Sequence, residues 1–355
     1  MGQSPNGENY TENPDDHILV QGNADIKNGR VVPRVWTTQV TKTAEPNDII
    51  ISVRAPVGDV GKTEYNVVLG RGVAGIRGND FIYQSLIKMK DIGFWTRFST
   101  GSTFESINSA DLKEALILVP SEVEQKKIGA FFKSLDDTIT FHQDAIQRQQ
   151  RLKKAMLQNL FPINGSTIPD VRFASFSEEW EQRKFSKIVN RVSKSSDEQN
   201  LPRVEYEDIV SGEGVLNKDI FEKSSEKKGT EFLPGDTLYG KLRPYLKNWL
   251  YADFKGIAVG DFWVLSPLNS NDEFVYSLIQ SDKYQLIANQ SSGTKMPRSD
   301  WSTVSNTAFF IPKNMDEQKK IGEFFKALEN SIDLHQQALE KLKLLKKSLL
   351  QKMFI

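Results

Sequence analysis

The chain has 355 residues, 46 Lys and Arg against 46 Asp and Glu, three histidines and no cysteine. The lack of cysteine excludes disulfides, a thiolate nucleophile and a Cys-ligated metal site, and a net charge of zero argues against an autonomous DNA binder, whose surface is usually basic. The length favours two or more domains, and without a long apolar run or a leader-like start we expect a cytoplasmic protein that binds no membrane.

Residues 1–120 are predicted to form a first globular domain. Short β-branched runs at Asp48–Val53 and Asn66–Leu69, separated by Gly, Pro, Asn and Asp, predict strands. The segment Val57–Thr63 has some likeness to a phosphate-binding P-loop, but Pro56 takes the place of its first glycine. A strand-like run follows instead of a helix, so we expect no ATP site here.

Residues 121–162 predict a long helix. Ser121 and Glu124 have the spacing of a capping box, and Pro162 and Gly165 end the helical pattern. About 39 residues in a helix would span roughly 58 Å. A heptad seam, the pattern by which helices pair as coiled coils, is formed by Ile128, Phe132, Leu135, Ile139, His142 and Ile146.

Residues 163–312 predict a second strand-rich domain, and residues 313–355 a second long helix. Strands are expected at Asp261–Leu265 and Ala308–Pro312, and a helix at Phe274–Asn289. Asn314 and Glu317 repeat the capping-box spacing. The second seam consists of Ile321, Phe325, Leu328, Ile332, His335 and Leu339. We interpret His142 and His335 as polar seam residues that fix helix register.

The two long helices are copies of one another. Residues Glu124–Phe161 align with Glu317–Phe354 at a constant offset of 193, with 20 of 38 positions identical. The basic excess of the chain lies in these helices, while the two globular segments are slightly acidic. A repeated domain-plus-helix unit predicts an α+β fold in which two strand-rich mixed domains are joined by two long antiparallel coiled-coil helices, related by a pseudo-twofold axis.

Several segments together resemble the specificity subunit of type I restriction-modification enzymes. The resemblance covers essentially the whole chain and depends on the order and doubling of its motifs. They are the two EQKKIG helices with their RLKKAMLQNLFP and LLKKSLLQKMFI ends, Ile168–Phe185, Leu238–Leu265, Ile51–Gly61, and the loops TGSTFESI and GTKMPRSDW.

This resemblance implies that each globular segment is a target recognition domain that reads one half of an asymmetric, bipartite double-stranded DNA sequence. The helices would set the spacing and dock two methyltransferase subunits, and motor-nuclease restriction subunits would complete the complex. The chain itself would carry no catalysis and no cofactor, since partner subunits would bind S-adenosylmethionine and ATP. Nothing in the first domain aligns with Pro169–Val192, so we expect that domain to be short at its N-terminus.

Base readout favours Arg, Lys and small polar side chains on loops. In the first domain the candidates for DNA contact are Arg30, Arg34, Arg71, Arg97, Ser102 and Thr103. In the second domain they are Lys241, Arg243, Tyr245, Lys247, Lys295 and Arg298. Arg54 and Arg243 precede prolines, which leaves a structural role open for both.

Enzyme readings find little support in the sequence. An amino-methyltransferase would need a glycine-rich cofactor loop and an Asn/Asp-Pro-Pro-aromatic motif, and neither occurs. Glu124 and Lys126 have a spacing found in nucleases, but helix capping explains the glutamate. The competing hypothesis is a non-catalytic coiled-coil adaptor with two protein-binding heads.

Overall fold

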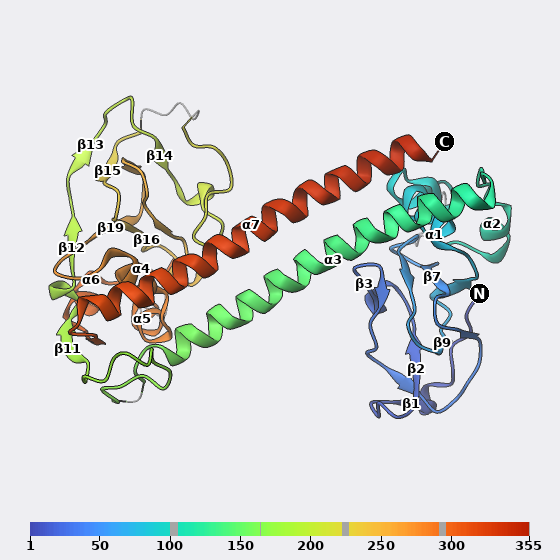
Figure 1. Ribbon diagram of the computed structural model, residues 1–355, viewed down its shortest axis with the longest axis horizontal. Helices are drawn as coiled ribbons and strands as arrows, with labels where there is room; N and C mark the ends of the chain where they lie inside the picture. The colour runs from blue at the N-terminus through green and yellow to red at the C-terminus, as the bar shows by residue number, and fades with distance from the viewer. Residues whose placement is uncertain (100–105, 164, 222–226, 291–295, 355) are drawn as a thin grey trace. The chain divides into compact units, whose positions relative to one another are not determined.

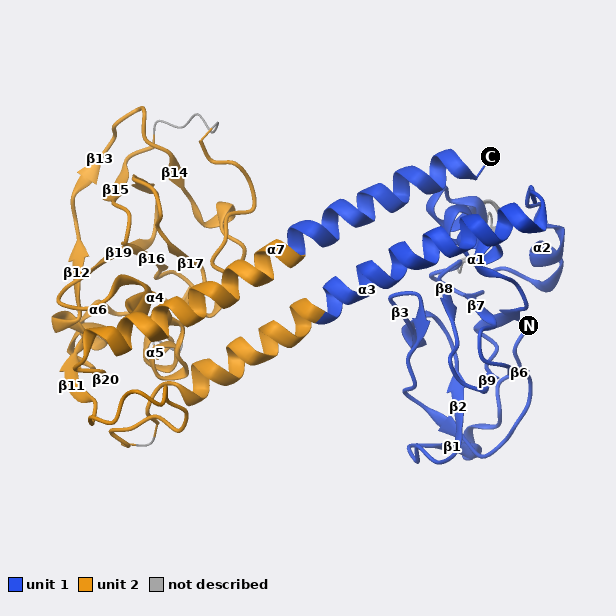
Figure 2. Ribbon diagram, viewed as in Figure 1, with its two compact units in different colours: residues 1–144, 336–355 blue, residues 145–335 orange. Residues whose placement is uncertain are grey.

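The computed structural model describes residues 1–99, 106–163, 165–221, 227–290 and 296–354, which form two compact units (Figure 1). Unit 1 comprises Met1–Asp144 with Gln336–Ile355, and unit 2 comprises Ala145–His335 (Figure 2). Each unit therefore contains one globular head and a part of both long helices. We call the globular parts head 1, residues 1–120, and head 2, residues 166–314.

Head 1 is built on two sheets in its described part, with strand orders β1-β5-β2-β9-β6 and β10-β7-β8-β4-β3. The strands are β1 Tyr10–Thr11, β2 His17–Val20, β3 Ile26–Lys27, β4 Arg30–Val31, β5 Trp36–Thr37, β6 Thr43–Ala44, β7 Ile49–Ser52, β8 Val60–Lys62, β9 Val67–Leu69 and β10 Val73–Ile76. The predictions of strands near residues 49 and 67 are confirmed by β7 and β9, which are buried throughout. Two helices, α1 Asp80–Asp91 and α2 Ser109–Glu114, complete the head.

Head 2 has three sheets in its described part, with orders β11-β20, β12-β19-β16-β17 and β13-β15-β18-β14. The strands are β11 Glu181–Lys184, β12 Val189–Val192, β13 Ser195–Ser196, β14 Arg203–Val204, β15 Gly229–Phe232, β16 Thr237–Gly240, β17 Trp249–Tyr251, β18 Gly256–Ala258, β19 Phe262–Pro267 and β20 Ala308–Ile311. The strands predicted near residues 261 and 308 are confirmed by β19 and β20.

The single helix predicted over 274–289 is wrong, because the chain forms two helices there. They are α4, Asp272–Gln280, and α5, Asp282–Ala288, and a third helix, α6, covers Trp301–Asn306. Ser281 between α4 and α5 is extended, and its hydroxyl accepts a hydrogen bond from the backbone N–H of Tyr284. This side-chain bond starts a new helix and competes with continuation of the first.

The two long helices are α3, Glu122–Asn159, and α7, Met315–Met353. Every residue predicted for the two seams is buried or half-buried. Within unit 2, Gln149 donates to the hydroxyl of Ser331, and Lys153 pairs with Glu329. Residue numbers that rise along α3 therefore meet numbers that fall along α7, so the predicted antiparallel pairing is confirmed within this unit.

The helix segments of unit 1 pair in the same sense. Lys346 on α7 forms an ion pair of 2.5 Å with Asp136 on α3. The ring of Phe354, just after α7, lies 5.6 Å from the ring of Phe132 near the start of α3. The end of one long helix therefore packs beside the beginning of the other.

A cluster of three phenylalanines attaches each head to its helices, and we call it the Phe junction. In unit 1 the ring centroids of Phe81 and Phe354 are 4.9 Å apart and those of Phe132 and Phe354 are 5.6 Å apart. In unit 2 the centroid distances from Phe161 are 5.9 Å to Phe274 and 6.3 Å to Phe325. The pairs equivalent by the offset of 193 are Phe81 and Phe274, Phe132 and Phe325, and Phe354 and Phe161.

A repeated glycine brings each long helix close to its head. A Cβ atom at Gly129 would lie 2.8 Å from the Cβ of Asp80, the first residue of α1. A Cβ atom at Gly322 would lie 2.6 Å from the Cβ of Glu273 and 2.7 Å from the backbone nitrogen of Phe274 in α4. Real Cβ atoms do not approach so closely, so only glycine permits this contact between helices.

The predicted capping box at the start of α7 is wrong for Glu317. Asn314 caps the helix by accepting from the backbone N–H of Asp316 at 2.7 Å. The carboxylate of Glu317 is 2% exposed and accepts hydrogen bonds of 2.7 and 2.8 Å from Arg172 and 3.2 Å from the indole of Trp180. A buried carboxylate is costly unless charged donors bind it, whereas a helix end in solvent loses little without a second capping side chain.

Replacing Gly322 by alanine tests the close helix contact. In an ordinary helix interior this change stabilises by about 1 kcal/mol. Here the new methyl group meets the backbone of α4, so we expect the free energy of unfolding to fall by about 1–3 kcal/mol. Thermal and urea unfolding would measure it. Ser134→Ala, at an exposed position of α3, is the matched control that should not destabilise. Equal stability of Gly322→Ala and the native chain would contradict the close contact.

Candidate nucleic-acid interface

Two segments of head 2 meet and bring together most of its predicted DNA contacts. The loop after β16 carries Lys241, Arg243, Tyr245 and Lys247, and the segment before α6 carries Arg298. A β-bridge joins residues 242 and 298, and backbone bonds of 2.7 and 2.8 Å join residue 243 to 297 and residue 299 to 241. We call residues 241–247 with 297–299 the head 2 platform.

Asp261 holds two of the cations on the platform. Its carboxylate lies 2.9 Å from Nη2 of Arg298 and 3.6 Å from Nζ of Lys241. The hydroxyl of Tyr206 donates to the backbone oxygen of Asp261 at 2.5 Å and accepts from the backbone N–H of Leu242 at 3.0 Å. Burial raises the pKa of Tyr206 well above its usual value, so its hydroxyl stays a neutral donor. The platform is therefore fixed in place while the Arg298 side chain remains 61% exposed.

The platform also contains two residues with unusual backbone conformations. Arg243 and Lys247 have φ values of 49° and 55°, in the left-handed region that favours glycine. Tyr245 between them is 55% exposed. No ion pair joins the Lys247 ammonium to an acidic group among the described residues. Glycine would fit both positions at lower cost, yet the chain has long cationic side chains there.

Head 1 presents a polar cavity of about 640 Å³ that contains the predicted contact Arg71. Arg54, for which sequence reasoning left a structural role open, lies beside it. No ion pair joins either guanidinium to an acid in the described part of the chain. The other lining residues are Ser4, Pro5, Asn6, Gly7, Tyr10, Gln21, Gly22, Asn23, Ala55 and Gly72. Guanidinium, amide and hydroxyl groups of this kind are suited to phosphates and base edges.

The remaining candidates of head 1 lie apart from this cavity or outside the described structure. Arg30 is 3.2 Å from Glu64 and 3.8 Å from Asp137, which makes it part of an ion-pair network. Arg34 donates to the backbone oxygen of residue 24 at 3.2 Å and lies 3.8 Å from Asp25. Ser102 and Thr103 lie outside the described residues, as does the side chain of Arg97. The head 2 candidate Lys295 also lies outside them.

Sequence reasoning did not include Asn6, Gln21 and Asn23 among the candidates. Gln21 and Asn23 lie in one turn after β2, Asn6 lies in the segment before β1, and no motif connects the two segments. Their common feature is that they line the same cavity as Arg71. Only folding brings these residues together.

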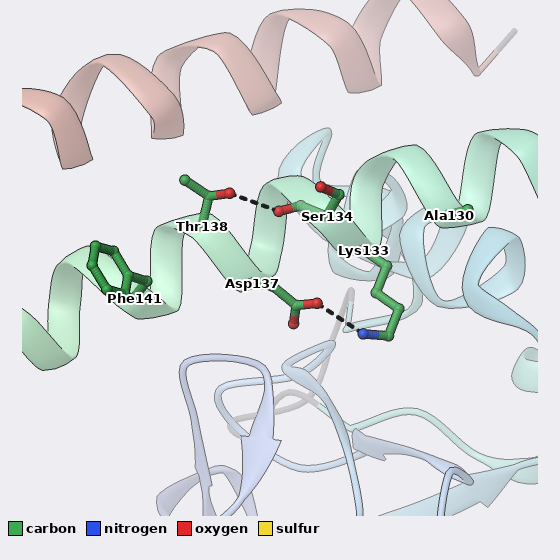
Figure 3. A pocket seen from close by; sticks show the side chains of 6 residues that line it. All are labelled: Ala130, Lys133, Ser134, Asp137, Thr138 and Phe141. Carbon is green, nitrogen blue, oxygen red and sulfur yellow. Dashed lines mark hydrogen bonds and ion pairs between the residues drawn. The ribbon is translucent and has the colours of Figure 1, made fainter.

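A hollow on one face of α3 has no catalytic arrangement. Figure 3 shows Lys133 joined to Asp137, and the hydroxyl of Thr138 bonded to the backbone of Ser134. The two hydrogen bonds are 2.8 and 2.9 Å long. These are local contacts within one helix. Among the described residues, no group of three or more acidic or histidine side chains could hold a metal ion. In the same part of the chain, no helix is both long and apolar enough to span a bilayer.

A protein family described as type I restriction modification DNA specificity domain matches residues 1–153 and 177–344. The chain belongs to this family. One relative, a type I restriction enzyme specificity subunit, MjaX, of Methanocaldococcus jannaschii, is 34% identical over 168 residues, which are 45% of this chain and 39% of that relative. The MjaIX specificity subunit of the same organism is 24% identical over 298 residues, 76% of this chain and 68% of that one.

A solved structure has the same fold. The type I restriction-modification S subunit from M. genitalium matches with a TM-score of 0.69 and 17% identity, and the match covers 100% of this chain and 92% of that one. The fold of strand-rich heads and long helices is therefore shared with that structure. Specificity subunits are the non-catalytic components of type I systems.

Arg71→Ala and Arg34→Ala form a matched pair of substitutions in head 1. Arg71 has no described acidic partner, whereas Arg34 is held near Asp25. If Arg71 contacts a phosphate, its loss should weaken DNA binding and lower the slope of log K against log salt by about 1. Salt titrations of DNA binding would measure this. Equal effects of the two substitutions would remove Arg71 from the interface.

Lys247→Gly tests the lysine side chain without disturbing the backbone conformation of the platform. Glycine accepts a φ of 55°, so we expect stability to stay equal or to rise by about 1 kcal/mol. DNA affinity should nevertheless fall, because a cation is lost. Thermal unfolding and DNA titration of the same preparation would show both effects. Unchanged DNA affinity would contradict a role for Lys247.

Proposed function

We propose that this chain determines the DNA sequence recognised by a type I restriction-modification complex. Each head binds one half of an asymmetric bipartite target, head 1 through the cavity at Arg71 and head 2 through its platform. The paired helices set the separation of the half-sites. Two half-sites about one helical turn apart are about 34 Å from centre to centre, within the length of helices of this size.

The observation that carries this proposal is a repeated frame with different surfaces. The Phe junction and the close glycine contact occur in both units at matching positions. The polar surfaces differ: head 1 offers arginines with amides, and head 2 offers lysines, arginines and an exposed tyrosine. Two different DNA-binding surfaces on a repeated frame are suited to a target that is not palindromic.

We further propose that the long helices dock two methyltransferase subunits, and that motor-nuclease subunits join the complex. In support, several large apolar side chains on α3 and α7 are exposed although the helices are paired. They are Phe141 at 56%, Leu334 at 66%, Leu344 at 68% and Leu345 at 49%. Exposed apolar groups of this kind favour a protein interface. The partners would bind S-adenosylmethionine and ATP, and they would supply much of the phosphate neutralisation that this neutral chain lacks.

Arg298→Ala tests the division of labour between the heads. If Arg298 reads a base, its loss should weaken binding to the half-site of head 2 by about 1–3 kcal/mol and leave the preference for the other half-site unchanged. Binding would be measured with duplexes altered in one half-site at a time, in the complex with the methyltransferase subunits. An unchanged preference at both half-sites would remove Arg298 from the interface.

Mapping of methylated sites in cells with and without the chain tests the function as a whole. We expect one bipartite sequence to lose methylation when the chain is absent. A methylation pattern that does not depend on the chain, together with no sequence-dependent binding to DNA, would favour the alternative of an adaptor with protein-binding heads.

A further inference from the structure

The head 2 platform ends in an apolar turn. Residues Pro244–Leu246 form a short 3₁₀ helix between the left-handed residues Arg243 and Lys247. Pro244 is buried, whereas the side chains of Tyr245 and Leu246 are 55% and 37% exposed. Two large side chains are thus presented to solvent at one turn, and we call residues 244–246 the platform tip.

Several hydrogen bonds hold the platform tip. The backbone N–H of residue 246 donates to the carbonyl of residue 243 at 2.8 Å, and the N–H of residue 247 donates to residue 244 at 2.9 Å. The neighbouring hairpin, residues 209–216, adds two more bonds. The hydroxyl of Ser211 donates to the carbonyl of Leu246, and the backbone N–H of Gly212 donates to that of Lys247 at 3.0 Å. The exposed side chains therefore stand on a fixed backbone.

A third exposed apolar side chain lies in the segment that is hydrogen-bonded to the start of the tip. Met296 is 53% exposed and precedes Pro297, whose carbonyl accepts from the backbone N–H of Arg243 at 2.7 Å.

Positive charge surrounds these apolar side chains. Residues 241–247 and 297–299 contain four cationic side chains and no acidic one. Among the described residues, Asp261 is the one carboxylate that pairs with any of them, and it pairs with Lys241 and Arg298. The platform therefore combines exposed apolar groups with an excess of positive charge, although the whole chain is neutral.

We propose that the platform tip is a wedge that enters a groove of the DNA and partly unstacks one base step in the half-site of head 2. The cations of the platform contact phosphates beside this step, and Tyr245 and Leu246 pack against the bases. Head 2 thereby reads how easily the DNA deforms, in addition to the hydrogen-bonding groups of the bases. The wedge rests on the DNA function proposed for the platform and deepens it.

Charge and rigidity favour DNA as the occupant. Protein interfaces are depleted in lysine, whereas cations beside an apolar side chain suit a groove in which phosphates flank the stacked bases. Unstacking a base step costs free energy, and ordering a mobile loop would add to that cost. A tip that is already held by hydrogen bonds avoids the second cost. Pyrimidine–purine steps unstack most easily, so we expect one at the contacted position.

Leu246→Ala shortens the wedge, and nicked DNA tests its action. Binding would be measured in the complex with the methyltransferase subunits, on the intact target and on duplexes that each have one nick, with its phosphate kept, in the head 2 half-site. A nick weakens stacking without changing any base. At one step it should strengthen binding of the native chain about fivefold. Leu246→Ala should bind the intact target about tenfold more weakly and gain less than about twofold from the same nick.

Two control variants separate the wedge from other effects. Leu246→Met keeps a long apolar side chain, so it should bind within about twofold of the native chain and gain from the same nick. Leu268→Ala removes a side chain that is 41% exposed at the other end of β19 from Asp261, roughly 20 Å away along the strand, and should behave as the native chain. Thermal unfolding of all three variants would confirm that they fold.

The wedge is overturned if Leu246→Ala has the affinity and the nick response of the native chain, or if no nick strengthens binding of the native chain. It is also overturned if Leu246→Ala weakens assembly with the methyltransferase subunits and leaves the nick response intact, because the tip would then be a protein-binding surface. Absence of sequence-dependent DNA binding by the native complex would instead contradict the proposed DNA function itself, so the two failures are distinguishable.

Discussion

The structure depends on the contact between each long helix and the first turn of a helix in its head. Gly129 and Gly322 have no Cβ atom, so the backbones of the two helices can approach closely. The Phe junction fills the space beside this contact. Each junction takes one ring from the head, one from the start of a long helix and one from the end of the other. Since burying a phenylalanine is worth about 1.5–3 kcal/mol, each junction ties three distant segments together by several kcal/mol.

This attachment separates the structural residues from the residues proposed to read DNA. The rings and glycines lie in buried junctions that recur in both units, whereas the cavity at Arg71 and the head 2 platform occupy surfaces on which the heads differ. Such surfaces can change without loss of the frame. The platform is nevertheless not loose, because Tyr206 and Asp261 hold its backbone and the head of Arg298. A rigid scaffold of this kind allows a few side chains to give specificity at low net charge.

Identical residues have different environments in the two units. Glu124 and Glu317 stand in the same six-residue motif, yet one is exposed and the other is bound by Arg172 and Trp180. The difference arises because the partners of Glu317 lie 137 to 145 residues away along the chain. Helix capping, which the local motif suggested, is too weak an effect to compete with burial of a paired carboxylate.

Local pattern was sufficient for the repeat, the long helices, the antiparallel pairing and the strands at residues 49–52, 67–69, 262–267 and 308–311, because periodicity and β-branching act over a few residues. The same information failed at Ser281, where one side-chain bond divides a helix. It also could not distinguish Arg71, which has no acidic partner among the described residues, from Arg30 and Arg34, which pair with distant or turn-forming acids. Sequence thus determined which elements form and how they repeat. Tertiary structure alone decided which charges are paired and which surface stays uncovered, because those outcomes depend on contacts between segments far apart in the chain.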